Sequence, residues 1–543
     1  MRSDQQQAIN RLAGTSATAF LCAVLCVYPL YIDKFSNLGV TKFTGCFTLF
    51  LLFLLWLVAC TAIGARAPRP RNANAGRDVT RWGVLAFAGT SLISTFTSLS
   101  PTASTWGLGG YYGGLMLVLF TAAGYWAVRS YLDLENLDFV FWVLGITTSI
   151  VAVLYVLNIF NIDLIGAYAD TAVVERAQFF STLGQKDFNG CFFSVALPIV
   201  FYQFLNAKDT RTAVWTGIPA AFGALALAVV DSEALALGIG AAVMVLVCHK
   251  NFTTRHLRRA ALISAAFFGW AAWMHYMRAS VYTQGGTALL AKLGAWQVAL
   301  PCMAASLLLW LVLFVLARKG IAAQAPLYLP GRVITIAVLA VGALAFVLAN
   351  AMPNRPLPES LHNLLVFNDD WGTYRGVAWR AAFGTWADGS LLRKIVGIGP
   401  GMMHTAVAAW AGDAMTARMA TFYAAHNEYL EQLLTTGILG LTAWLLLVAA
   451  HLQRGERSWN TPGVAPVMLA LCSYLAQAVV SIRVSMVFPL VMLLFGALAA
   501  LTAPELPQPA APALRGKKQQ KPEPLPPKNA WYFAKTVLAA VLC

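Results

Sequence analysis

The sequence predicts an all-α protein, a polytopic bundle of transmembrane helices. Apolar residues make up 59% and charged residues only 11% of its 543 residues, whereas a soluble domain carries about 25% charged residues. Apolar stretches of about 18 residues, long enough to cross a bilayer as a helix, recur along nearly the whole chain. These stretches lack the period-two alternation of a membrane barrel, and lipid admits only helices and closed barrels.

Hydropathy predicts about fourteen spans. They lie near residues 15–32, 42–64, 82–100, 112–130, 138–158, 188–206, 213–230, 233–249, 258–277, 296–317, 333–351, 430–450, 463–482 and 485–502. The first span follows Arg2 and Arg11 and lacks a small-residue cleavage site. We therefore expect a retained helix rather than a removed signal peptide.

Basic residues gather in alternate loops, and this pattern predicts the orientation of the chain. One alternate set of loops contains Arg66, Arg69, Arg71, Arg77, Arg81, Arg129, Lys208, Arg211, Lys250, Arg255, Arg258, Arg259, Arg318, Lys319, Arg332, Arg454 and Arg457. By the positive-inside rule these loops and the N-terminus are cytoplasmic, and the loops at 159–187 and 352–429 are extracytoplasmic. The net charge of +15 then reflects topology and contact with anionic lipid heads, and no nucleic acid is expected as a partner.

The membrane domain is expected to cover residues 1–502. A Pro- and Lys-rich cytoplasmic linker follows at 503–530, too polar and too rich in Pro to fold. The apolar tail at 531–543 is too short to span, so we expect it to lie at the interface or to belong to a truncated helix. No internal repeat is evident, which weighs against a transporter built from two related halves.

The large loop at 352–429 is the expected site of chemistry and is predicted to contain amphipathic helices. Within it, seven residues recur at three- and four-residue spacing and share one helical face: Trp371, Arg375, Ala378, Trp379, Ala382, Phe383 and Trp386. Such a helix would lie on the membrane surface or cap the bundle. Arg375 and Arg380 are about 140° apart on it, so we favour Arg375 for ligand contact and Arg380 for solvent or headgroups.

Three basic residues of the outer loops, Arg176, Lys186 and Arg375, run against the charge bias of the chain. A lipid-linked pyrophosphate would explain them, because the planar fork of Arg pairs with phosphate oxygens and stabilises charge on a departing phosphate. The alternative is that the arginines reach lipid phosphates or pair with Glu175 and Asp370.

His426 ends the large loop and is followed by Asn427 and Glu428. A neutral imidazole can take a proton from a sugar hydroxyl, although a His at the start of a helix can also be a cap or a packing residue. No HExxH pair or carboxylate cluster accompanies it, and the nine cysteines lie almost wholly in predicted spans without a CxxC pair. Neither a metal nor another cofactor is expected.

The glycines at 397–401 offer two interpretations. Gly399 and Gly401 could help to form a backbone nest for phosphate, or the segment could be a turn between amphipathic helices.

Four motifs in order resemble the O-antigen ligase and polymerase superfamily, in which a large extracytoplasmic loop carries the same series. They are Arg-x-x-x-Trp at 375–379, the glycine-rich segment at 396–401, His-Asn-Glu-Tyr-Leu at 426–430 and Gly-Ile-Leu-Gly at 437–440. Upstream, residues 182–190 look like the Gly-x-x-Asn segment of the family, and 106–114 like its earlier outer loop. The similarity covers most of residues 15–500. The chain departs from the family pattern at Glu233, where many members have Arg, and at Asp187, where they have Asn.

The resemblance implies a metal-independent, inverting glycosyltransferase of the bacterial cytoplasmic membrane. Such an enzyme moves a glycan from a polyprenyl-pyrophosphate donor to a lipid, glycan or protein hydroxyl outside the cytoplasm. The predicted catalytic residues are His426, Arg375 and Arg176, and the predicted substrate-binding residues are Lys186, Trp379, Asn427, Glu428, Gly399 and Gly401. The alternatives are a polytopic transporter or lipid-linked-glycan flippase, or a catalytically silent scaffold. A transporter would carry paired ionisable residues or broken helices at mid-membrane depth.

Overall fold

The computed structural model describes residues 2–66, 78–108, 110–230, 232–280, 293–321, 323–352, 357–407, 410 and 423–503. Within these ranges the chain is helical, and its only β contacts are two isolated bridges, Phe180 to Gly184 and Thr253 to Pro326. The all-α prediction is therefore confirmed for this part of the chain. The predicted linker at 503–530, apart from its first residue, and the predicted tail at 531–543 lie outside the described residues.

Helices follow one another along almost the whole described chain. In order they are α1 (Arg2–Cys22), α2 (Leu38–Ala62), α3 (Val79–Phe96), α4 (Pro101–Trp106), α5 (Leu115–Tyr131), α6 (Leu137–Ile159), α7 (Lys186–Asn206), α8 (Thr210–Val229), α9 (Glu233–Cys248), α10 (Thr254–Ser280), α12 (Trp296–Arg318), α13 (Tyr328–Ala351), α14 (Glu359–Leu365), α15 (Trp371–Ala387), α16 (Leu391–Val396), α18 (Glu428–Arg457), α19 (Val464–Gln477) and α20 (Phe488–Leu501). Each predicted span overlaps one of these helices.

Eight helical segments of the described chain are long and apolar enough to cross a membrane, so the chain is a multi-pass membrane protein. They are Asp4–Leu30, Phe35–Ala62, Leu134–Ile159, Lys186–Asn206, Thr210–Val229, Trp296–Arg318, Tyr328–Ala351 and Glu428–Arg457. The apolar helices α9, α19 and α20 are shorter. At 14 residues each, α19 and α20 rise only about 21 Å.

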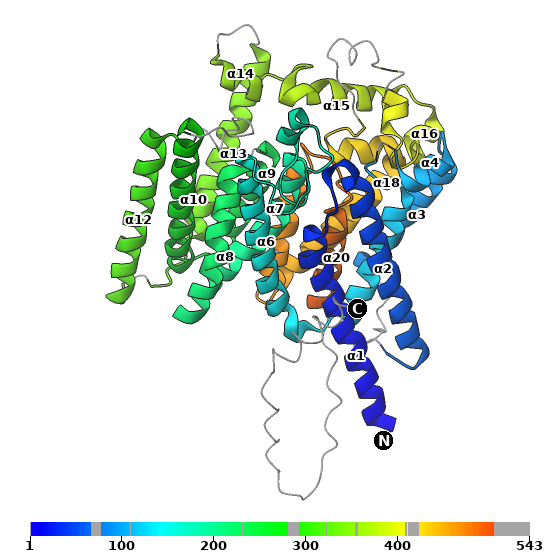
Figure 1. Ribbon diagram of the computed structural model, residues 1–543, viewed down its shortest axis with the longest axis horizontal. Helices are drawn as coiled ribbons and strands as arrows, with labels where there is room; N and C mark the ends of the chain where they lie inside the picture. The colour runs from blue at the N-terminus through cyan, green and yellow to red at the C-terminus, as the bar shows by residue number, and fades with distance from the viewer. Residues whose placement is uncertain are drawn as a thin grey trace, which may run out of the picture.

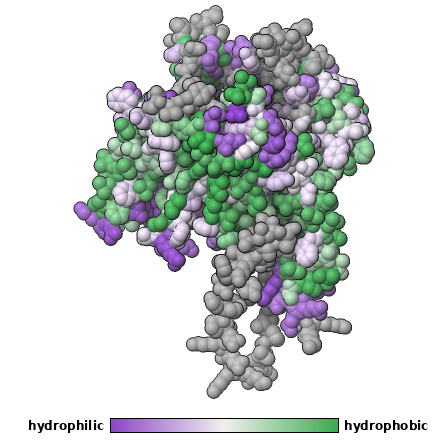
Figure 2. All heavy atoms as spheres, viewed as in Figure 1, coloured by the Kyte–Doolittle hydropathy of each residue, from purple (hydrophilic) through white to green (hydrophobic). Residues whose placement is uncertain are grey.

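The helices form a bundle with a cap across one end (Figure 1). We call residues 357–407, which contain α14, α15 and α16, the cap; the N-terminus lies at the opposite end of the bundle. Every residue of α20 is buried in the middle of the bundle. In contrast, α12 and α13 lie on the outside and bury almost none of their side chains. Figure 2 shows apolar residues over the middle of the visible face and polar residues gathered towards both ends, as a protein surrounded by lipid requires.

Two glycines allow the cap to approach α18 closely. Gly437 breaks α18 with a φ of 68°, and Gly397 follows α16 with a φ of 81°. A Cβ at Gly437 would collide with the carbonyl of Ile395, and one at Gly397 with the carbonyl of Thr435. Because only glycine tolerates both the positive φ and the contact, these residues let the end of α16 lie directly against the backbone of α18.

Candidate functional site

A cluster of three polar side chains lies between the cap and the bundle. Asp187 comes from the first turn of α7, Arg375 from α15, and His426 from the loop before α18. Arg375 Nη2 lies 3.9 Å from Asp187 Oδ2, and the two side chains are only 14% and 19% exposed. His426 is half-buried, and the charges of both residues act on its imidazole. Segments far apart in the sequence thus meet in one site, which we call the Asp187–Arg375–His426 cluster.

The imidazole of His426 is neutral at neutral pH. Burial, and after it the positive charge of Arg375, lowers the pKa of His426 to about 4, although the carboxylate of Asp187 opposes the shift. The backbone of His426 has a φ of 50°, which is uncommon for a residue other than glycine. Such conformations persist where the surroundings enforce them, often at functional sites.

Hydrogen bonds on both sides hold the loop that carries His426. Before it, Ala425 N donates to Glu431 Oε2 at 3.2 Å. After it, Asn427 Oδ1 accepts from the amides of Tyr429 and Leu430, both at 3.0 Å, and so caps α18. The predicted substrate-binding residue Asn427 is therefore occupied as a helix cap, and it positions His426 through the backbone.

Asp187 links the cluster to a second helix of the bundle. Its Oδ1 accepts a hydrogen bond of 2.8 Å from Ser232 Oγ, at the start of α9. One carboxylate oxygen is thus engaged by Ser232, and the other faces Arg375. Lys186 precedes Asp187 in the chain and is half-buried, so it lies beside the cluster at the start of α7.

The helix predicted in the large loop is present as α15 from Arg375 onward, and its two arginines separate as predicted. The prediction that Trp371 shares this helix is wrong, because Gly372, Thr373 and Tyr374 have positive φ values and break the helix there. Arg375 faces Asp187, whereas Arg380 is 57% exposed and pairs with Asp369. The buried stripe is centred on Ala378, Ala381 and Ala382. Phe383, placed on that face by the prediction, lies at its edge and is 51% exposed.

Trp379 supports His426 from the cap. Its Nε1 donates to the carbonyl oxygen of His426 at 3.4 Å, and its ring packs edge-on against Trp371 with centroids 5.1 Å apart. The indole therefore fixes the histidine loop against α15, and its contact with substrate stays a prediction.

Arg176 lies in a separate environment. It belongs to a 3₁₀ helix, Val173–Gln178, and its guanidinium lies 5.4 Å from the ring centroid of Tyr168. Within the described chain, none of the ion pairs or side-chain hydrogen bonds of Asp187 and Arg375 involves Arg176. The structure thus brings two of the three predicted catalytic residues together and leaves the third apart.

The glycine-rich segment packs the cap onto the bundle. The amide of Gly399, which a phosphate nest would need, donates to Thr435 O at 2.9 Å and to Ser94 Oγ at 3.1 Å. A Cβ at Gly399 would also collide with Ser98. These contacts favour the turn over the nest. Gly401, in contrast, lies at the edge of a polar chamber beneath the loop.

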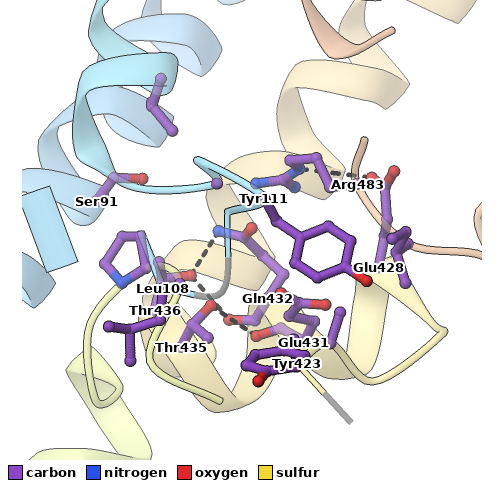
Figure 3. A pocket seen from close by; sticks show the side chains of 16 residues that line it. Ser91, Leu108, Tyr111, Tyr423, Glu428, Glu431, Gln432, Thr435, Thr436 and Arg483 are labelled. Carbon is purple, nitrogen blue, oxygen red and sulfur yellow. Dashed lines mark hydrogen bonds and ion pairs between the residues drawn. The ribbon is translucent and has the colours of Figure 1, made fainter. Parts of the chain in front are cut away.

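This polar chamber lies between α18, the loop after α4 and the turn between α19 and α20 (Figure 3). Tyr111, Tyr423, Glu431 and Arg483 surround it. The space that water-sized molecules can occupy is about 30 Å³, enough for about two waters.

One wall of the chamber holds a buried ion pair. Arg483 Nε lies 3.6 Å from Glu428 Oε2, and Tyr474 donates to the other carboxylate oxygen. The guanidinium of Arg483 also lies 4.6 Å from the ring centroid of Phe488. Yet Arg483 Nε and Nη2 and Glu428 Oε2 make no hydrogen bond within the described chain. The predicted residue Glu428 is therefore part of a buried ion pair at the start of α18.

Asp187, Glu431 and Arg483 were not among the predicted site residues. Arg483 had a clear signal, because it is the only charged residue between Arg457 and Glu505, and an isolated charge in an apolar membrane segment marks a functional site by default. For Glu431 the only sequence signal was its position five residues after His426.

Within the described residues, fold and site together define a multi-pass, all-helical membrane protein with a half-buried charged cluster beneath its cap. The chain matches no protein-family model and no curated protein.

Proposed function

We propose that the protein is a membrane glycosyltransferase that moves a glycan from a polyprenyl-pyrophosphate donor to an acceptor hydroxyl. The Asp187–Arg375–His426 cluster carries this proposal, because it sets a cation suited to phosphate beside a neutral imidazole suited to accept a proton. The order of the loop motifs, which resembles the O-antigen ligase and polymerase superfamily, supports the same activity.

The site lies outside the cytoplasm in this proposal, in a bacterial cytoplasmic membrane crossed about fourteen times. The loops that carry the basic residues support this orientation, since they meet at the end of the bundle away from the cap. There Leu327 N donates to Phe252 O, and Asn251 Nδ2 donates to Asn460 Oδ1. The positive-inside rule assigns that end to the cytoplasm.

The donor pyrophosphate replaces Asp187 as the partner of Arg375. The existing pair is long, at 3.9 Å, and a pyrophosphate offers Arg375 two oxygens and more charge than one carboxylate. Arg375 then stabilises the negative charge that builds up on the leaving pyrophosphate as its bond to the anomeric carbon breaks.

His426 takes the proton of the acceptor hydroxyl while the hydroxyl oxygen forms the new bond to the anomeric carbon. With a pKa of about 4, His426 is a weak base in the free protein. Pyrophosphate bound at Arg375 offsets one of the charges that lowers this pKa and adds negative charge nearby. The base therefore strengthens when the donor is bound, so donor binding precedes deprotonation of the acceptor.

The test is complementation of a source strain that lacks the gene, followed by profiling of surface glycans and lipid-linked intermediates at equal membrane levels of protein. We expect His426→Ala and Arg375→Ala to abolish the polymer and to accumulate extracytoplasmic donor. The matched control Arg380→Ala, from the exposed face of the same helix, is expected to retain activity.

The variant Asp187→Asn tests whether the donor pyrophosphate replaces Asp187 as the partner of Arg375. It retains an acceptor for Ser232 and removes the charge that competes for Arg375, so the KM for the donor is expected to fall about tenfold, the effect of about 1.4 kcal/mol. Full activity of His426→Ala and Arg375→Ala, or an unchanged donor KM in Asp187→Asn, would contradict the roles proposed for this cluster. Donor trapped on the cytoplasmic face would instead favour a flippase.

A further inference from the structure

A second cavity lies between the cap and the bundle, at the opposite end of α15 from Arg375. Leu99, Trp386, Arg393, Ile398, Ala406 and Leu434 line it, and its volume is about 250 Å³. Most of its lining side chains are apolar. An apolar cavity of about 150 Å³ in another protein admits benzene, so this hollow has room for a length of hydrocarbon chain.

The hollow adjoins a lipid-facing flank of the bundle. Leu99 lines the cavity and is also exposed on this flank. One turn earlier, Phe96 at the end of α3 is 75% exposed. On the other side, Leu391 and Leu392 of α16 are 75% and 60% exposed. Large apolar side chains gathered at one edge of a membrane protein are expected to contact lipid. An apolar surface thus runs from the flank of α3 to the hollow.

Positive charge lies beside this apolar surface. Arg393 lines the hollow, and Lys394 follows it in α16. Within the described residues, neither side chain has an ion-pair partner, and the nearby carboxylate of Asp388 accepts a hydrogen bond from Trp410 Nε1 at 2.8 Å. The indole of Trp386, a residue typical of the headgroup region, donates to Lys394 O at 3.2 Å. An apolar hollow with two cations at its edge complements a hydrocarbon chain attached to a phosphate.

We infer that this hollow holds one acyl chain of an anionic phospholipid from the cap-side leaflet, with the phosphate bound by Arg393 and Lys394. Bound in this way, the lipid holds α16 and the end of α15 to the membrane surface. The site is separate from the Asp187–Arg375–His426 cluster, because Trp386 lies at the far end of α15, about 16 Å along the helix from Arg375, and Arg393 lies beyond it in α16. It does not depend on the proposed glycosyl transfer.

The test is photo-crosslinking of the full chain in phosphatidylcholine nanodiscs. The probe is phosphatidylglycerol with a diazirine at the end of one acyl chain, and phosphatidylcholine with the same chain is the uncharged counterpart. In the native protein, phosphatidylglycerol is expected to label peptides that contain residues 385–406 and 434 about fivefold or more above phosphatidylcholine.

Two variants distinguish binding of the acyl chain from binding of the headgroup. Ala406→Phe fills the hollow and is expected to abolish labelling inside it by both probes. The double variant Arg393→Gln/Lys394→Gln is expected to remove the preference for phosphatidylglycerol, about fivefold for each basic residue. Arg380→Gln, an exposed arginine of the same cap, is the matched control and should leave the labelling unchanged.

Label spread evenly over the exposed faces of α12, α13 and α3 would overturn the inference, because it would show bulk lipid contact only. Equal labelling by the two probes in the native protein would also overturn it, since the basic residues would then bind no headgroup. Both readouts are binding measurements, so they stand whether or not the His426 and Arg375 variants lose activity.

Discussion

The two ends of α18 hold charged residues in different ways. At its C-terminal end, Arg454 Nη1 lies 3.0 Å from Asp78 Oδ1, and Arg129 pairs with the other oxygen of the same carboxylate. Arg454 also donates to Thr502 O at 3.0 Å. At the N-terminal end, the ion pairs Arg483–Glu428 and Arg375–Asp187 are 3.6 and 3.9 Å long, and the first leaves polar atoms without hydrogen bonds.

The difference separates a structural contact from a site prepared for a ligand. At the C-terminal end, Arg454 of α18 and Arg129 of α5 both pair closely with the Asp78 carboxylate before α3, and Arg454 also reaches the end of α20. A third arginine, Arg81, lies 3.5 Å from the same carboxylate, and its Nε makes no hydrogen bond within the described chain. At the N-terminal end, long pairs and unsatisfied donors are retained although burial makes them costly. Polar groups that must bind a ligand or water cannot all be hydrogen-bonded within the protein. We therefore place the function at the N-terminal end of α18.

The largest effect is expected from Asp78→Asn. This change leaves three arginines facing one another, and loss of one partner from a buried pair costs about 3–5 kcal/mol. Thermal unfolding in detergent measures the loss. Asp209→Asn is the control, since Asp209 is an exposed cap of α8 and Asn caps a helix equally well. An Asp78→Asn protein as stable as the native one would show that this end is not a structural contact.

The pH dependence of stability follows from the same carboxylate. Burial raises the pKa of Asp78, but a hydrogen bond from Thr80 and the charges of Arg129, Arg454 and Arg81 outweigh it and hold the pKa below its ordinary value. A lowered pKa means that the stabilisation is present above an ordinary carboxyl pKa of about 4 and is lost as the pH falls through the lowered value. In Asp78→Asn this loss in acid should disappear.

A smaller effect is expected at the N-terminal end of α18, where Arg483→Met removes one partner of a buried pair. The change should cost about 3 kcal/mol, because it leaves the buried carboxylate of Glu428 uncompensated. Adding Glu428→Gln should restore most of the stability, since a buried pair replaced as a whole is often neutral.

A double-mutant cycle by thermal unfolding measures this coupling. If the two losses simply added, Arg483 and Glu428 would be independent, and the comparison between the two ends would fail.

The sequence predicted the helices and the buried face of α15 around Ala378 and Ala382, but not the break before Arg375 or the contacts between distant segments. Periodicity alone separated Arg375 from Arg380, because both lie on one helix. No local pattern could show that Asp187, on α7, faces Arg375, or that Arg483 pairs with Glu428. Those contacts depend on how helices pack, and a linear pattern does not contain that information.

Because a linear pattern does not show contacts between helices, it also could not show what some of the predicted site residues bind. Asn427 and Trp379 fall within the motif segments, yet one caps α18 and the other holds the His426 carbonyl. A motif identifies residues that matter together without separating those that touch a ligand from those that position a neighbour. Gly399 is a similar case, since its amide is engaged by Thr435 and Ser94.

The smallest expected effect is a shift in the titration of His426, and it tests the electrostatic coupling within the cluster. Arg375→Gln removes a charge that lowers the pKa of His426, so this pKa should rise from about 4 towards 6.5 without reaching it, because burial is the larger cause. Asp187→Asn should lower the pKa of His426, since the Asp187 carboxylate raises this pKa.

Diethyl pyrocarbonate acylates the neutral imidazole. The pH dependence of the acylation rate at His426, followed by peptide mass spectrometry, therefore reports the pKa of His426 in each variant. Arg380→Gln should leave the titration where it is in the native protein, since Arg380 faces away and pairs with Asp369. Identical titrations in Arg375→Gln and Arg380→Gln would mean that Arg375 does not act on His426. The coupling between donor binding and the strength of the base would then be lost, and with it the reason for regarding this end of α18 as the reactive one.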